Sequence, residues 1–313
     1  MSNYAVIQVS ISVIEQMKHH YNAYLAPKVP PGGVFSAKIA SCTITAYKSG
    51  KVLFQGTGAV QEAARWGQQA PATAKSTVPK KKAVTIYTPP DEIGAMSAIG
   101  SDEVGTGDYF GPMIVAAAYV EKTQLPLLKE LGVRDSKTLT DEQIAALAKQ
   151  LISFLPYSLL TLHNEKYNEL QGKGLNQGEL KARMHNQAIN KVLERLQPHK
   201  PEAIVIDQFV QPDTYYKYLA KQKNVQRENV YFSTKGESVH LAVAAASIIA
   251  RYAFVKQFAE LSKQAGFILP KGAGAQVDAA AAKIIKKYGE GCLKTYAKLH
   301  FANTEKAKQL ANK

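Results

Sequence analysis

The chain has 313 residues, 46% of them hydrophobic, which favours globular domains with buried cores over a disordered chain. Its formal net charge of +14 favours an acidic partner, most simply nucleic acid. The two cysteines, Cys42 and Cys292, are too few and too far apart for a disulfide framework or a cysteine metal site, so a reducing cytoplasmic location is expected. The first twenty residues do not resemble an export signal, and no uninterrupted apolar run approaches the ~18 residues of a membrane span.

The first 66 residues predict a small α+β domain in the order β-α-β-β-β-α. The predicted strands are 4–10, 34–41, 42–48 and 51–56, and the predicted helices are 12–25 and 59–66. A hairpin at Ser49-Gly50 joins the last two strands. Alternation places Thr43, Thr45 and Tyr47 on one face of the sheet. An open face carrying tyrosine near lysines suits base stacking and phosphate contact, although an ordinary solvated sheet face has the same pattern.

Charge is distributed unevenly along the chain. Residues 1–90 contain nine Lys and one Arg but only Glu15 and Glu62 as acids, a net charge of +8, whereas residues 91–313 carry +6 with both signs mixed. We therefore expect the front of the chain to bind a polyanion and the back to hold the acids that chemistry needs. Residues 67–83, rich in Ala, Pro, Thr, Gln and Lys, predict a flexible linker. The expected domains are 1–66 for substrate binding, 67–95 as linker and entry segment, and 96–313 for catalysis.

The second part predicts an α/β fold with a mixed sheet. Predicted strands are 95–105, 112–120, 157–162, 201–209 and 231–238, and predicted helices are 144–154, 179–196 and 241–264. Thr140 begins a capping-box sequence, T-D-E-Q, which indicates where the first of these helices starts. The apolar run that ends at Asp207 is typical of a strand covered on both faces.

The stretch GSDEVGTGDYFGP, residues 100–112, does not fit a nucleotide-cofactor loop. A dinucleotide fingerprint has G-x-G-x-x-G and opens a helix, so that phosphate meets the helix N-terminus. Here the third glycine comes one position late, Pro112 follows it, and the next segment predicts a strand. No G-x-x-x-x-G-K-[ST] phosphate loop occurs in the sequence.

Four acids are candidates for one catalytic site. Asp102 and Glu103 lie near the end of a predicted strand, Asp207 ends another, and Glu237 precedes the long Ala-rich helix. Neighbours in a strand face opposite sides, so both Asp102 and Glu103 reach one site only if the chain turns at Glu103, which Gly105 and Gly107 make feasible. Converging carboxylates would repel one another unless divalent metal compensated, and oxygen ligands favour Mg²⁺ or Mn²⁺. Two such ions are the standard means of hydrolysing a phosphodiester.

Several stretches resemble the type 2 ribonuclease H family. GSDEVGTGDYFGP is similar to the family's first motif, and its D-E-V-G-T-G-D form is similar to the ribonuclease HIII branch. The resemblance continues through RDSKTL (134–139), IVIDQF (204–209), AVAAASIIAR (242–251), LPKGAGAQVD (269–278) and KLHFAN (298–303), covering about residues 96–305. The basic N-terminal module is similar to the TATA-box-binding-protein-like domain of that branch.

The resemblance implies a ribonuclease H-like fold and endonucleolytic cleavage of the RNA strand of RNA/DNA hybrids, leaving 5′-phosphate and 3′-hydroxyl ends. It implies that Asp102, Glu103 and Asp207 bind metal. Glu237 falls at the fourth acid, which is Asp in many members, and Gly236 replaces a more usual Ala.

The resemblance further assigns the loop Gly105-Thr106-Gly107 to contact with the RNA strand near its 2′-hydroxyls, where glycine permits close backbone approach. Type HII enzymes have Arg in this loop, and Thr106 stands there instead. Lys137 matches a lysine that contacts phosphate, and a solvated loop lysine is the alternative interpretation.

Two other functions remain open from the sequence. One is a ribonuclease HII-like enzyme that incises at single ribonucleotides in DNA, and the other is a non-catalytic nucleic-acid-binding protein that has kept the fold. No protein partner or membrane association is implied, and no heptad or long apolar edge indicates a stable dimer, so a monomer is expected.

Overall fold

The computed structural model describes residues 4–30, 32–66 and 85–312, which belong to two compact units, one within Met1–Ala83 and the other within Val84–Lys313. The predicted linker at 67–83 lies outside the described residues. Residues 85–95, from the predicted entry segment, are described and include a 3₁₀ helix at Asp91–Ala95.

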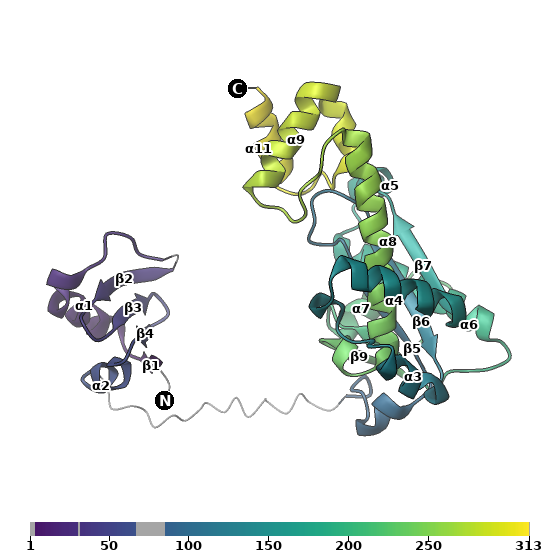
Figure 1. The fold of residues 1–313 in the computed structure, drawn as a ribbon, viewed down its shortest axis with the longest axis horizontal. Helices are drawn as coiled ribbons and strands as arrows, with labels where there is room; N and C mark the ends of the chain where they lie inside the picture. Colours follow the sequence, from purple (N-terminus) through teal and green to yellow (C-terminus); the bar gives the residue numbers. More distant parts are fainter. Residues whose placement is uncertain (1–3, 31, 67–84, 313) are drawn as a thin grey trace. The chain divides into compact units, whose positions relative to one another are not determined.

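The first unit has the predicted order β-α-β-β-β-α, and Figure 1 shows its helices together with its sheet. Its elements are β1 (Tyr4–Gln8), α1 (Ile11–His20), β2 (Gly33–Lys38), β3 (Thr43–Tyr47), β4 (Lys51–Gln55) and α2 (Ala59–Ala64), with a 3₁₀ turn at Asn22–Tyr24. The antiparallel sheet has the order β1-β4-β3-β2. Ile44 and Ala46 are fully buried against the helices, as predicted, but Thr45 on the opposite face is also buried, with 6% exposure, so burial does not alternate along β3.

The second unit is built on a mixed sheet of order β7-β6-β5-β8-β9, in which β5, β8 and β9 run parallel and β6 and β7 run antiparallel to their neighbours. The strands are β5 (Ala98–Val104), β6 (Met113–Val120), β7 (Tyr157–Leu162), β8 (Ala203–Asp207) and β9 (Val230–Ser233). The helices are α3 (Leu125–Glu130), α4 (Asp141–Phe154), α5 (Asn164–Gly172), α6 (Gln177–Leu196), α7 (Pro212–Tyr218), α8 (Leu241–Ala265), α9 (Ala275–Tyr288), α10 (Leu293–Tyr296) and α11 (Asn303–Ala311). Short 3₁₀ turns lie at Lys122–Gln124, Ser136–Thr138, Gly236–Ser238 and Glu290–Cys292.

Helices cover both faces of this sheet, which explains why β6 is apolar almost throughout. Its even-numbered residues, such as Ile114 and Ala116, pack in a core formed with α4 and α8. Its odd-numbered residues, such as Met113 and Val115, pack in a second core with α6 and α7. Figure 1 shows α4 crossing α8 on one side of the sheet.

Local sequence signals fix several helix ends. Thr140 and Gln143 form the predicted capping box at the start of α4, with both reciprocal hydrogen bonds present. Helix α8 ends at Gly266, which adopts the left-handed conformation with φ of +77°. This helix is long and apolar enough to cross a membrane, but 67% of its most apolar window is buried in the unit, as in the core helix of a globular fold.

Candidate active site

The first two acids project from opposite faces of β5, which corrects the expected turn at Glu103. The strand continues to Val104, and its pairing with β6 matches Asp102 with Ala116 and Glu103 with Val115. Regular alternation therefore holds through both acids. The face carrying Asp102 packs against α8 and the face carrying Glu103 packs against α6, so each acid has its own set of neighbours.

On the α8 side, close packing is made possible by Gly100, two residues before Asp102. A Cβ at Gly100 would lie 2.1 Å from the backbone nitrogen of Val243, so any other residue would push α8 away from the strand. This approach brings Ser247 of α8 into hydrogen-bonding contact with the Asp102 carboxylate. Ser247 also hydrogen-bonds with Ser136 at 2.9 Å, which joins the segment carrying Lys137 to the same face.

Asp207 lies beside Asp102 because their strands are parallel neighbours. The register pairs Ser101 with Ile206, so the two aspartates follow at the next position of each strand. One Asp207 carboxylate oxygen accepts a 2.7 Å hydrogen bond from the backbone N–H of Gly236. That contact brings the 3₁₀ turn Gly236–Ser238, and with it Glu237, to the carboxyl ends of the strands.

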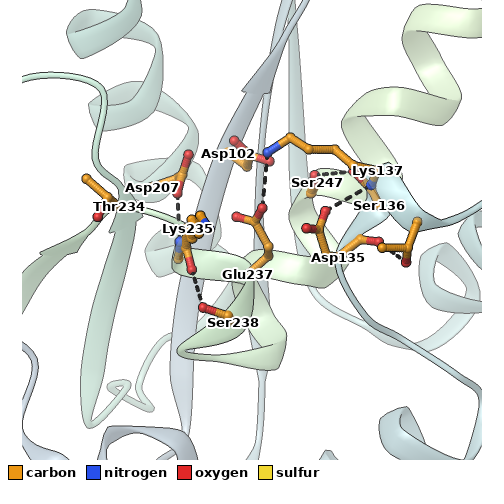
Figure 2. Close-up of polar contacts among 12 residues, drawn as sticks. Asp102, Asp135, Ser136, Lys137, Asp207, Thr234, Lys235, Glu237, Ser238 and Ser247 are labelled. Carbon is orange, nitrogen blue, oxygen red and sulfur yellow. Dashed lines mark hydrogen bonds and ion pairs between the residues drawn. The ribbon is translucent and has the colours of Figure 1, made fainter. Parts of the chain in front are cut away.

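Figure 2 shows Asp102, Asp207 and Glu237 gathered in one place, with the Lys137 side chain reaching over them. Lys137 Nζ lies 3.1 Å from Glu237 Oε1, and the lysine side chain is 78% exposed whereas that of Glu237 is 4% exposed. Its bond to Glu237 raises the pKa of Lys137. The structure thus places the Asp135-Ser136-Lys137 segment beside the acids. The sequence alone allowed two interpretations of Lys137, a site residue or a solvated loop lysine.

The two aspartates at this edge ionise less readily than ordinary carboxylic acids. Burial, followed by the charges of Glu103 and Asp207, raises the pKa of Asp102 from 3.8 to about 8. Burial and the charges of Glu237 and Glu103 also raise the pKa of Asp207, against the lowering effect of the Gly236 N–H. A site with these shifts is stabilised by any cation that arrives between the carboxylates.

Glu103 is in the opposite electrostatic state. Its two carboxylate oxygens contact two side chains of α6, Lys181 Nζ at 2.9 Å and His185 Nε2 at 2.9 Å. Burial alone would raise the Glu103 pKa, but the hydrogen bonds and charges of His185 and Lys181 outweigh it, so the pKa is lowered. His185 is fully buried, and its Nδ1 pairs with Ser101 Oγ at 2.8 Å.

Lys181 and His185 are functional-site residues that sequence reasoning missed. They stand four residues apart on α6, which places both on one face of the helix. Phe209, just after β8, supports them: Lys181 Nζ lies 4.1 Å from its ring centroid and the His185 ring stacks on it at 5.2 Å. The i,i+4 spacing was visible in the sequence, but nothing local in it indicated that this face meets Glu103.

The donor set fits a divalent cation, although the acids are not closed around a common point. In the described ranges 4–30, 32–66 and 85–312, no group of three His, Cys, Asp or Glu side chains is assembled as a metal-binding cluster. Glu103 is turned to α6 and Glu237 to Lys137, and these contacts account for the open arrangement. Oxygen donors alone suit Mg²⁺ or Mn²⁺, and because burial and the charges of Glu103 and Asp207 raise the Asp102 pKa, a bound cation would favour its ionised form.

The glycines that follow β5 have separate physical roles. Gly105 has φ of +82°, and a Cβ there would lie 2.3 Å from the carbonyl oxygen of Pro112. Gly107 is exposed, and a Cβ there would meet nothing within 4 Å. Between them, the Thr106 carbonyl accepts a 3.0 Å hydrogen bond from Gln177 Nε2 at the start of α6. The chain needs Gly105 for its own folding, whereas Gly107 leaves open space above the backbone.

The fold is that of the ribonuclease HII family, a class of nucleases. The sequence model of the ribonuclease HII family matches residues 99–304, and a domain of unknown function, DUF3378, matches residues 4–79. The first match covers more than half of the chain and confirms the expected ribonuclease H-like fold of the catalytic part.

Relatives that match along the whole chain show which branch of the family this chain belongs to. The ribonuclease HIII of Bacillus mycoides (strain KBAB4) is 66% identical over 313 residues, covering 100% of both chains, and that of a Bacillus cereus strain is 67% identical over 314 residues, covering 99% of each. The crystal structure of Bst-RNase HIII in complex with Mn²⁺ is 45% identical with a TM-score of 0.69, covering 98% of this chain and 99% of the other. The chain belongs to the ribonuclease HIII family and is an enzyme of the nuclease class.

Proposed function

We propose that this enzyme hydrolyses the RNA strand of RNA/DNA hybrids endonucleolytically, leaving 5′-phosphate and 3′-hydroxyl ends, with Mg²⁺ or Mn²⁺ as the divalent cofactor and two ions engaged during catalysis. The observation that carries the proposal is the set of buried and half-buried acids gathered at the carboxyl ends of β5 and β8, with the Asp102 pKa raised to about 8. Membership of the ribonuclease HIII family supports the same activity.

Asp102, Glu103, Asp207 and Glu237 would hold the cofactor. When bound there, divalent metal supplies Lewis-acid activation of water and stabilisation of the leaving oxygen of a phosphodiester. Asp102 and Asp207 are adjacent across the parallel strands, and burial together with neighbouring carboxylates raises the pKa of both, so a bound cation would favour their ionised forms. Glu237 would be a further ligand if its ion pair with Lys137 opened.

The two lysines at the site then have distinct tasks. Lys137, with its exposed side chain and bond to Glu237, exchanges the carboxylate for a phosphate oxygen of the RNA strand when substrate and cofactor arrive. Lys181 is only 14% exposed and lies against Phe209, so it stays within the protein. Together with His185 it fixes the orientation of the Glu103 carboxylate, so that this carboxylate is already oriented when the cofactor binds.

The backbone of Gly105, Thr106 and Gly107 would contact the RNA strand at its 2′-hydroxyl groups. Gly107 is exposed with open space above it, so a ribose can approach the main chain without meeting a side chain. The 2′-hydroxyl is the group that distinguishes RNA from DNA, and backbone donors and acceptors at fixed positions can recognise it.

The N-terminal unit would bind the hybrid without sequence preference, as its predicted similarity to a TATA-box-binding-protein-like domain suggests. Its open sheet face bears Tyr4, 60% exposed, and Val6, 54% exposed. A hollow of about 520 Å³ on this unit is lined by Val6, Gly32, Tyr47, Ser49, Lys51 and Leu53. Ring and aliphatic surface beside a lysine suits contact with sugars and phosphates of a nucleic-acid backbone.

The deciding experiment is a cleavage assay on a uniform RNA/DNA hybrid with Mg²⁺, with Mn²⁺ and with EDTA, alongside a DNA duplex and a duplex containing one ribonucleotide. We expect metal-dependent cleavage along the RNA strand of the hybrid and none of the DNA duplex. Preferential incision at the single ribonucleotide would instead identify a ribonuclease HII-like specificity. Absence of cleavage under all conditions would leave a non-catalytic binding protein.

A further inference from the structure

A lysine is buried directly behind the glycine loop, which we define as residues 105–111. Lys298 is 0% exposed, and its Nζ donates to the carbonyl oxygens of Asp108 at 2.8 Å and Gly111 at 2.6 Å. An ammonium group away from water is costly unless it is hydrogen-bonded, so this side chain is retained for the contacts it makes. Burial lowers the Lys298 pKa to about 7, which the nearby Asp108 charge partly opposes.

Two C-terminal segments, around Gly272 and around residues 296–298, hold the second half of the loop, mainly through backbone hydrogen bonds. The Asp108 side chain accepts from Gly272 N–H at 2.6 Å, and Tyr109 N–H donates to the Gly272 carbonyl at 2.9 Å. Lys298 N–H donates to the Tyr109 carbonyl at 2.9 Å, and Gly111 N–H donates to the Tyr296 carbonyl at 3.0 Å. Residues 108–111 are therefore fixed by segments that are distant from them in the sequence.

The first half of the loop is held from another direction. Gln177 Nε2 donates to the Thr106 carbonyl at 3.0 Å and lies 3.2 Å from the hydroxyl of Tyr167, which is itself fully buried. Between the two attachments lies Gly107, which is exposed and has open space where a Cβ would be. The result is a short exposed piece of main chain supported on both sides.

We propose that Lys298 is a positioning residue for RNA recognition, fixing the carbonyl groups of the glycine loop so that residues 105–107 meet the ribose in a preset conformation. This inference rests on the proposed role of the loop in contacting 2′-hydroxyls. A loop that is already ordered avoids ordering costs on binding, and a small displacement of recognition groups lowers both affinity and rate. Lys298 touches no acid of the metal site, so its effect is separable from metal binding.

The test compares Lys298→Met, which keeps the length of the side chain but removes the donor, with Lys294→Met, a change at an exposed lysine four residues earlier. Hydrogen exchange of the loop amides reports on the anchor without any substrate. We expect exchange at 106–111 to become about tenfold faster in Lys298→Met, the size expected for losing charge-assisted hydrogen bonds, while β5 and β6 exchange as in the parent. Lys294→Met should leave both unchanged.

Substrate selection is then measured as the ratio of affinities for a hybrid and for a DNA duplex of the same sequence, in EDTA to prevent cleavage. This ratio should fall about tenfold in Lys298→Met, with the KM for hybrid raised more than kcat is lowered in Mg²⁺. Mn²⁺ affinity measured by calorimetry should stay within about twofold of the parent, because the four acids are untouched.

Unchanged loop exchange in a folded Lys298→Met protein would overturn the anchoring role, and faster exchange with an unchanged affinity ratio would overturn the link to RNA recognition. Should Lys298→Met fail to fold, Lys298→Gln replaces the charged donor to the Asp108 and Gly111 carbonyls with a shorter, uncharged one. It should give the same exchange and selectivity changes, and their absence would overturn the proposal. Failure of the parent to cleave hybrid would contradict the proposed function, while the exchange result would still decide whether Lys298 anchors the loop.

Discussion

The open sheet face of the N-terminal unit and the acid-bearing edge of the second unit differ in the sign of their charge and in how far it is exposed to solvent. The first unit has few acids, and the hollow beside Lys51 lies at the surface. At the acid-bearing edge of the second unit, the acids are buried or half-buried, and two of them contact lysines, Glu103 with Lys181 and Glu237 with Lys137. Exposed positive charge attracts a polyanion over a long range, and salt screens this attraction. Buried carboxylates act only locally, where a bound cation would favour their ionised forms. Binding and chemistry are thus expected to be separable by mutation.

Asp102→Asn should have the largest effect on chemistry. The substitution removes a buried carboxylate that feels the charges of Glu103 and Asp207 and hydrogen-bonds with Ser247, while keeping its shape. We expect kcat on hybrid to fall to about one hundredth of the parent or lower, with hybrid affinity nearly unchanged. Steady-state kinetics and anisotropy binding measure the two quantities. Residual activity well above that level would remove Asp102 from the metal site.

Deleting residues 1–66 should produce the reverse pattern. We expect hybrid Kd at about 150 mM salt to rise tenfold or more, because sheet contacts to the backbone are lost, and the dependence of binding on salt to become shallower. Cleavage at saturating hybrid should change by less than about threefold. If affinity and its salt dependence are both unchanged, the N-terminal unit has no binding role.

Lys181→Met tests how much the ion pair between Lys181 and Glu103 contributes to the stability of the folded protein. Glu103 is 10% exposed and Lys181 14%, so removing the lysine leaves a buried carboxylate with only His185. We expect the metal-free protein to lose about 2–3 kcal/mol of stability in urea unfolding, part of which Mn²⁺ restores.

The matched control is Lys173→Met, which removes an exposed lysine paired with Glu169 at 2.6 Å. An exposed pair of this kind contributes about 0–1 kcal/mol, so little change is expected. Equal losses in the two variants would show that the Glu103 pair has no special importance.

The pH dependence of stability should reveal Asp102 in the metal-free enzyme. Its folded pKa of about 8 lies above the ordinary value of 3.8. Between these two pH values the folded state therefore binds more protons than the unfolded state. The free energy of unfolding therefore falls as pH rises from about 4 to 8. Asp102→Asn removes this term, and we expect its Tm without metal to exceed that of the parent by about 5 °C at pH 8.5. The gain should vanish near pH 4, and a constant gain at all pH values would contradict the assignment.

Much of the fold followed from local sequence pattern. Alternation in β3, the buried apolar run of β6 and the Thr140 capping box each gave the observed element, because each depends on neighbours within a few residues. The short helices α3, α5 and α7 and the C-terminal helices α9 to α11 were not among the predicted elements. The resemblance covered part of that C-terminal region by motif but indicated nothing about what it contacts.

The sequence by itself determined the family and singled out the candidate acids, since GSDEVGTGDYFGP and the strand ending at Asp207 are recognisable as they stand. Only the tertiary structure decided how the acids are held. Regular pleating through β5 turns Asp102 toward α8 and Glu103 toward α6, where Lys181 and His185 lie on a helix nearly eighty residues away. Likewise, no local pattern could show that Lys298 supports a loop almost two hundred residues earlier. Such partners are fixed by the packing of whole helices on a sheet, which depends on burial summed over the core and not on the spacing of any one motif.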